Sequence, residues 1–194
     1  RQRQMCIRDR PYLPFLKDFN FEIATTNTFP HSSGIASSAS GMSALACCLI
    51  DLEKIISNEE NPDKYWIQKS SFIARLGSGS ACRSLEGNIV VWGDHSKITN
   101  SSNLFGVKYE GEVHENFNNY QDTILLVDKG EKQVSSSVGH NLMHQHPFAK
   151  KRFEQANENI TRLLPVLKNG NLSKFIEIVE SEALTLHALS LIHI

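Results

Sequence analysis

The sequence predicts a mixed α and β fold, because apolar strand candidates are followed by serine-rich loops and amphipathic helices. Residues 21–29 mix apolar side chains with threonines up to Pro30, which is typical of a strand. A loop rich in glycine and serine then leads into residues 42–56, where apolar residues recur every three or four positions. The most apolar strand candidate, 122–130, precedes a second serine-rich loop and a long amphipathic helix within 146–170. Strands thus alternate with helices, and no repeat indicates a solenoid.

Shorter elements are expected between these two regions. Residues 58–66 form a polar break, and residues 71–76 look like a short helix or the end of one. Residues 87–94 are a strand candidate with small residues at both ends. The stretch 95–119 is polar and irregular, apart from a possible short strand at 104–109, and we interpret it as a hinge or insertion.

The C-terminal region predicts two helices. The long helix is expected to be bent or interrupted near Pro165 and to end at Gly170 and Asn171. Ser173 is a candidate cap for a last helix, whose apolar side chains lie within 175–186.

Composition and charge exclude several classes of protein. The chain has 194 residues, of which 40% are hydrophobic and 21% charged, as in an ordinary soluble globular protein. Four arginines and one aspartate give the first ten residues a charge of +3 and leave −4 for the rest, which argues against nucleic acid as a partner. No apolar run approaches the roughly 20 residues that a membrane span needs, and no signal peptide pattern is present.

The cysteines and histidines do not predict a metal site. The four cysteines lack CxxC or Cys/His ligand spacing, which favours a reducing, cytoplasmic location. His140, His144 and His146 lie close together in the sequence, but we expect a polar loop there because no cysteine or carboxylate accompanies them.

The two ends of the chain fit poorly with the rest. Residues 1–10 have no periodicity and carry an isolated positive charge, and residues 189–194 do not continue the polar face of the preceding helix. We interpret both as non-native tails around an internal fragment of a longer protein.

The first serine-rich loop, 30–41, has the composition of a phosphate site. Gly34 permits a close turn, Ser37 and Ser38 offer hydroxyl groups, and the following helix would point free N–H groups at the loop. The loop lacks both GxxxxGK[ST] and GxGxxG, which disfavours a P-loop or a dinucleotide fold. A serine-capped helix without a ligand remains an equal alternative.

The second loop lies in RLGSGSACRSLEGNIV, residues 75–90. Ser78 and Ser80 present hydroxyl groups, and Arg83 is a cation that could hold a carboxylate or phosphate through two hydrogen bonds. Cys82 has no evident histidine partner, so we expect a small buried side chain rather than a nucleophile. The glycine spacing does not match a GxSxG nucleophile elbow.

The third loop, VSSSVG at 134–139, follows the apolar strand candidate. Hydroxyl groups at the carboxyl end of a strand often face a ligand crevice. Three such loops in one short chain favour an anionic ligand with several phosphates.

Together, NTFPHSSGIASSASG, ARLGSGSACRSLEG and KQVSSSVGH resemble the diphosphomevalonate decarboxylase family of the GHMP kinase superfamily. The resemblance covers nearly all of residues 20–189. It implies an α+β, two-lobe GHMP kinase fold that is incomplete at both ends. Residues 11–118 would belong to an N-terminal lobe like domain 2 of ribosomal protein S5, and 119–188 would begin a ferredoxin-like C-terminal lobe.

The resemblance also implies a reaction. Members of the family convert mevalonate 5-diphosphate to isopentenyl diphosphate with ATP and Mg²⁺, by phosphorylation of the 3-hydroxyl and loss of phosphate and CO₂. It implies a small-molecule substrate, a cytoplasmic location and a homodimer, with no nucleic-acid or membrane partner. Alternatives are a related mevalonate or phosphomevalonate kinase or decarboxylase, or a GHMP-like binding protein without catalysis.

Site roles follow from the same motifs. Arg83 would grip the departing carboxylate. The serines expected to contact the substrate are Ser78, Ser80, Ser135 and Ser136. The residues expected around the ATP phosphates are Gly34, Ala36, Ser37, Ser38 and Ala39, with Ser37 and Ser38 also near Mg²⁺. The family's catalytic aspartate and N-terminal lysine segment are absent from this chain, so we expect this chain alone to be inactive.

Overall fold

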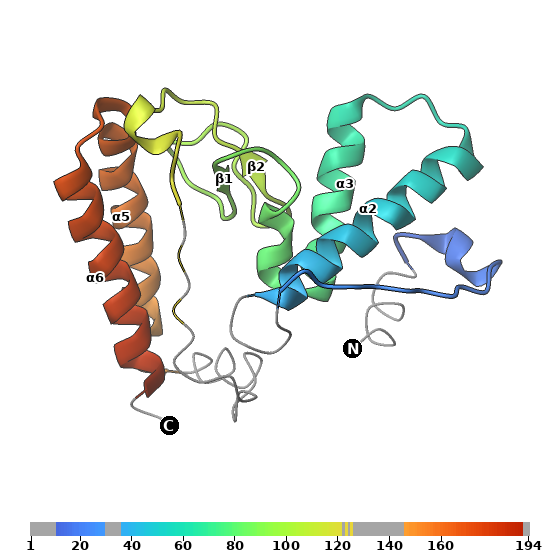
Figure 1. The fold of residues 1–194 in the computed structure, drawn as a ribbon, viewed down its shortest axis with the longest axis horizontal. Helices are drawn as coiled ribbons and strands as arrows, with labels where there is room; N and C mark the ends of the chain where they lie inside the picture. Colours follow the sequence, from blue (N-terminus) through green and yellow to red (C-terminus); the bar gives the residue numbers. More distant parts are fainter. Residues whose placement is uncertain (1–10, 30–35, 122, 124, 126–145, 192–194) are drawn as a thin grey trace. The chain divides into compact units, whose positions relative to one another are not determined.

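The structure, a computed structural model, describes residues 11–29, 36–121, 123, 125 and 146–191 (Figure 1). Its contacts divide the chain into two compact units, Arg1–Tyr109 and Glu110–Ile194. The predicted lobe boundary between residues 118 and 119 and the two non-native tails stay predictions. The predicted strand 122–130 lies almost wholly outside the described residues.

The first unit is built on two helices and two short 3₁₀ turns. Helix α2 spans Ser37–Ser57 and helix α3 spans Asp63–Gly77, while η1 is Pro14–Lys17 and η2 is Gly79–Arg83. Helix α2 therefore begins five residues earlier than its apolar periodicity predicts. Helix α3 starts directly after Pro62, so the predicted polar break is shorter than expected and the predicted short helix is the end of a longer one.

A common core joins these elements. Helices α2 and α3 pack against each other, and η2 packs against both. Buried apolar side chains from all of them form one cluster, in which Leu13, Ala46, Ile73, Ala74 and Ala81 have no exposed surface. Because η2 contributes Ala81 to this core, its backbone is anchored while its polar side chains remain outside.

The sheet of the first unit is small. Strand β1, Val90–Val91, pairs antiparallel with β2, Val107–Lys108. The predicted strands 87–94 and 104–109 are thus present but much shorter. Gly93 has a φ of 120°, a conformation that ends the extended run soon after β1.

The predicted strand at 21–29 is wrong for this structure. This segment is irregular, and Phe21 and Ile23 are 42% and 40% exposed. Within the described residues it pairs with no other strand. Alternating apolar residues form a strand only when a neighbouring strand satisfies their backbone groups.

The second unit contains η3, Glu115–Phe117, and two long helices, α5 at Ala149–Asn169 and α6 at Leu172–Leu191 (Figure 1). Helix α5 is continuous across Pro165, so the predicted interruption does not occur. The predicted stop at Gly170 is confirmed, since this residue adopts a φ of 75° and its N–H donates to the Val166 carbonyl.

The cap of α6 differs from the prediction. The Asn171 side chain accepts a hydrogen bond from the Lys174 N–H at 3.0 Å. Ser173 lies inside the helix instead of capping it. Asparagine is as good a cap as serine and stands one residue before the first helical position.

A polar network connects α5 to α6. Buried Arg152 donates to one carboxylate oxygen of Glu182, and Asn159 donates to the other at 2.7 Å. Two further nitrogens of Arg152, Nε and Nη1, are buried without a partner among the described residues. Glu182 is therefore the main counter-charge of this guanidinium.

No helix among the described residues is long and apolar enough to cross a bilayer.

A substitution at Gly106 tests how closely the residue before β2 packs on η2. A Cβ atom there would stand 2.5 Å from the Cys82 carbonyl oxygen, whereas one at Gly41 would have no atom within 4 Å. We expect Gly106→Ala to lower the free energy of unfolding in urea by about 1–3 kcal/mol. Gly41→Ala, in a helix, should raise it by about 0.5–1 kcal/mol. Equal stability of Gly106→Ala and the parent chain would contradict the described contact.

Glu182 tests the network between α5 and α6. We expect Glu182→Ala to lower the free energy of unfolding by about 1–3 kcal/mol, because it leaves a buried guanidinium without its counter-charge while Glu182 itself is partly exposed. Glu180→Ala, an exposed change on the same helix, is the control. Urea unfolding followed by circular dichroism would show the difference, and equal losses for both variants would refute the role of Glu182.

Candidate functional site

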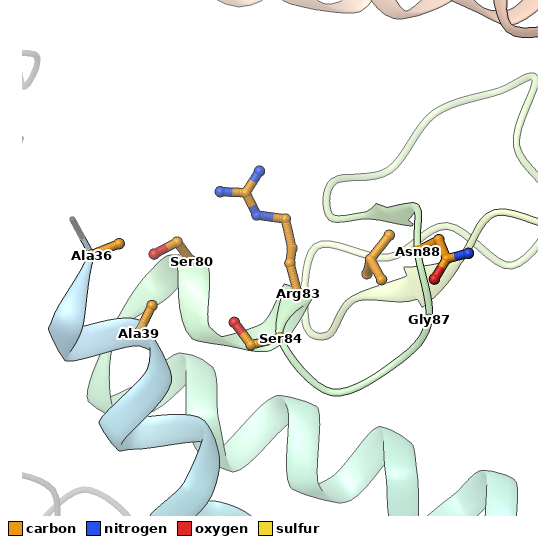
Figure 2. A pocket seen from close by; sticks show the side chains of 8 residues that line it. Ala36, Ala39, Ser80, Arg83, Ser84, Gly87 and Asn88 are labelled. Atoms are coloured by element: carbon orange, nitrogen blue, oxygen red, sulfur yellow. The ribbon is translucent and has the colours of Figure 1, made fainter. Parts of the chain in front are cut away.

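The first unit contains an open cavity of about 350 Å³. It lies where the first turn of α2, the turn η2 and the chain leading into β1 come together (Figure 2). Eight residues line it: Ala36, Ala39, Ser80, Arg83, Ser84, Gly87, Asn88 and Val90.

Arg83 supplies the positive charge of this cavity. It is the last residue of η2, and its side chain is exposed. Figure 2 shows the guanidinium reaching into open space, with Ser80 and Ala36 on one side. No hydrogen bond or ion pair connects it to another side chain in the described part of the chain. An arginine without a counter-charge in a cavity can bind a carboxylate or a phosphate through two hydrogen bonds.

The start of α2 forms the opposite wall. Ala36 occupies the N-cap position with a φ of 54°, and its methyl side chain cannot accept a hydrogen bond from the first amides of the helix. The alternative prediction of a serine-capped helix is therefore wrong for α2, whose N-cap is an alanine. A helix of 21 residues has a partial positive charge at this end. The cavity thus has electropositive groups on two walls.

The predicted site residues divide into three groups. Four of them line the cavity together: Ala36, Ala39, Ser80 and Arg83. Ser38 and Ser78 are not among the lining residues, but their hydroxyl oxygens lie 3.5 Å apart, and Ser37 begins α2. The rest lie outside the described residues: Gly34, Ser135 and Ser136. The structure thus brings the first two serine-rich loops to one place.

Cys82 is buried, as predicted, with 1% of its surface exposed. Its thiol donates to the Gly79 carbonyl at 3.1 Å. Burial raises the pKa of the thiol, and the positive charges of Arg83 and Arg75 counter this only in part. A protonated, buried thiol is a poor nucleophile, so Cys82 serves packing.

Two serines that were not predicted contact η2. Ser43 of α2 and Ser71 of α3 are both buried, and their hydroxyl groups lie within hydrogen-bonding distance of the carbonyls of Ala81 and Cys82. One signal was available in the sequence for Ser43, because it falls on the same helix face as Ala39 and Ala46. A polar residue on an apolar face calls for a buried partner.

Among the described residues, no group of three or more histidine, cysteine or acidic side chains is placed to hold a metal ion. His146 is described, whereas His140 and His144 lie outside.

Comparisons with known proteins point to one family. The family described as diphosphomevalonate decarboxylase-like N-terminal domain matches residues 2–104. The diphosphomevalonate decarboxylase of Aspergillus fumigatus is 30% identical over 188 residues, which cover 96% of this chain and 44% of the relative. The diphosphomevalonate decarboxylase of Candida albicans is 27% identical, and the match covers 98% of this chain and 50% of that relative. The chain spans about half the length of the curated relatives it matches.

A solved structure agrees. The mevalonate diphosphate decarboxylase of Legionella pneumophila superposes with a TM-score of 0.64 at 29% identity, over 84% of this chain and 47% of that one. This likeness confirms the GHMP kinase fold class that the sequence predicts, although the described residues of this chain contain only one two-stranded sheet.

The thiols provide a test of the buried η2. At pH 8, iodoacetamide should modify exposed Cys48 rapidly and Cys82 slowly, because burial and a raised pKa both protect Cys82. Peptide mapping by mass spectrometry would follow both sites, with urea-unfolded protein as the control in which the rates converge. Equally fast labelling of the two cysteines in the folded chain would show that η2 is not packed as described.

Proposed function

Because the chain belongs to the diphosphomevalonate decarboxylase-like family, we propose that it forms the substrate side of an ATP-dependent decarboxylase acting on mevalonate 5-diphosphate. One observation carries the proposal. Arg83 and the uncapped start of α2 line the same cavity, and both attract anions. A substrate carboxylate on Arg83 and the phosphates of ATP at the start of α2 match such a site.

The proposed reaction converts mevalonate 5-diphosphate and ATP to isopentenyl diphosphate, ADP, phosphate and CO₂. ATP supplies the phosphoryl group that turns the tertiary 3-hydroxyl into a good leaving group. The bond to the carboxylate then breaks, its electron pair forms the alkene, and the 3-oxygen leaves with phosphate. The proton released from the 3-hydroxyl ends on the departing phosphate, so no further reactant is needed.

Arg83 would orient the carboxylate that is lost. A guanidinium holds a carboxylate in one plane through paired hydrogen bonds, which fixes the direction of the breaking bond. Its exposure in the cavity leaves both outer nitrogens available to a ligand. Arg83 is therefore a binding and orienting residue, and it takes no proton during the reaction.

The serines would hold the diphosphate. Ser80 lines the cavity on the same turn as Arg83, and Ser78 lies at the entrance to that turn. Ser80 would donate its hydroxyl to a phosphate oxygen from the cavity wall, and Ser78, whose hydroxyl oxygen lies 3.5 Å from that of Ser38, would contribute from the N-cap of η2. Ser135 and Ser136 lie outside the described residues, and their expected contact with the same substrate stays a prediction.

The start of α2 fits the phosphates of ATP. The first turn of the helix offers amide donors, and Ser37 and Ser38 are its first two residues. No cluster of acidic side chains in the described residues suits Mg²⁺ on its own. The ion would therefore be held mainly by the phosphates, with Ser37 and Ser38 nearby.

Compartment and partners belong to the same proposal. The three cysteines that the structure describes are free thiols, which supports a reducing, cytoplasmic location. We also carry over from the family a homodimer, which analytical ultracentrifugation of the chain would test.

Arg83→Ala tests the substrate site through binding, which this chain can show without turnover. We expect it to weaken binding of mevalonate 5-diphosphate at least about 10-fold, since a charge-assisted hydrogen bond contributes roughly 1.5–3 kcal/mol. The affinity of Arg83→Lys should lie between those of the parent chain and Arg83→Ala, because lysine keeps the charge and loses the paired hydrogen bonds. Isothermal titration calorimetry measures both.

Lys64→Ala removes an equal charge from an exposed position on α3 and should leave the affinity unchanged. The same titrations with mevalonate and mevalonate 5-phosphate separate this function from that of a related kinase. Unchanged affinity in Arg83→Ala would refute the proposed substrate site.

A further inference from the structure

Two consecutive carbonyl groups immediately before Arg83 each lie against a buried serine hydroxyl. The Ala81 carbonyl is 2.9 Å from the Ser43 oxygen, and the Cys82 carbonyl is 2.8 Å from the Ser71 oxygen. The two serines come from different helices, α2 and α3. The backbone that carries Arg83 is therefore fixed from two directions.

Ser43 connects the two walls of the cavity. Its hydroxyl also lies 2.7 Å from the Ala39 carbonyl, in the first turns of α2. Since a serine has one proton to donate, it shares that proton between Ala39 and Ala81. Ala39 and Ser80, on either side of this contact, both line the cavity.

Ser71 connects η2 to the chain before β2. It donates to the Cys82 carbonyl and accepts a hydrogen bond from the Gly106 N–H at 2.9 Å. It is 1% exposed, so water cannot replace either bond. The absence of a side chain at Gly106 lets these two segments approach each other.

The turn η2 depends on such external bonds. A 3₁₀ helix of five residues has few internal hydrogen bonds and weak intrinsic stability. Ser80 and Arg83 point into the cavity, and no described side chain orients Arg83 there. The direction in which η2 presents them is consequently set by its backbone.

We propose that Ser43 and Ser71 are positioning residues for Arg83, whose hydroxyl groups fix the Ala81 and Cys82 carbonyls and so aim the guanidinium at the substrate carboxylate. The proposal rests on the proposed function, because it needs Arg83 to bind the ligand. The same hydroxyl groups also satisfy buried backbone groups, so the serine variants should lose some stability as well, and the dependence of their effect on Arg83 is what distinguishes a positioning role. Ser70, also buried and adjacent to Ser71, makes no hydrogen bond to η2.

A double-mutant cycle in the 194-residue chain tests this role. Calorimetry measures binding of mevalonate 5-diphosphate to the parent chain, Ser43→Ala, Arg83→Ala and the double variant. We expect Ser43→Ala to weaken binding about 3- to 10-fold when Arg83 is present and less than about 2-fold when it is absent. Ser71→Ala should behave alike, and Ser71→Thr, which keeps the hydroxyl, should restore most of the affinity.

The control is Ser70→Ala, which should not change the affinity in either background. Circular dichroism and urea unfolding establish that each variant is folded. If Ser71→Ala does not fold, the test is carried out with Ser43→Ala alone. Equal losses with and without Arg83 would mean that the serines act on the fold in general and would overturn the proposal. No loss in the serine variants, with a large loss in Arg83→Ala, would also overturn it while leaving the proposed function intact. If Arg83→Ala itself binds normally, the proposed function fails, and this inference fails with it.

Discussion

The Cys82 carbonyl is the point on which the arrangement of the cavity depends. Ser71 of α3 donates to it, and Gly106 lies so near that a Cβ atom would collide with its oxygen. One backbone group thereby brings α3, η2 and the start of β2 together. Its neighbour, the Ala81 carbonyl, adds α2 through Ser43. Arg83 follows directly, so its position is a consequence of four elements packing around two peptide groups.

This arrangement separates the buried and exposed roles of one short segment. Ala81 and Cys82 point inward and pack in the core, while Ser80 and Arg83 point outward into the cavity. A 3₁₀ turn places residues three positions apart on one side, which puts Ser80 and Arg83 on the same face. The tight turn thus presents a hydroxyl and a guanidinium together, next to the positive end of α2. The cavity attracts anions without needing any buried charge.

The sequence was sufficient for the parts that depend on local chemistry. Apolar spacing predicted the helices α2, α5 and α6, and glycine, serine and arginine content singled out the stretch around Arg83. It was insufficient where contacts with distant parts of the chain decide the local structure, as for the strand expected at 21–29 and the short length of β1 and β2. Ser71 was not predicted for the same reason, because it looks like an ordinary helical serine until the carbonyl that it contacts is known, whereas Ser43 could have been singled out by its place on an apolar helix face.

The central claim is that η2 presents Arg83 to the substrate carboxylate, and nuclear magnetic resonance can observe this directly. The side-chain Nε–Hε signal of Arg83 would be followed while mevalonate 5-diphosphate is titrated into the ¹⁵N-labelled chain. We predict a saturable shift of that signal, together with shifts in the amides of Gly79–Ser84. Saturable binding that leaves the Arg83 signal and these amides unmoved would contradict the account.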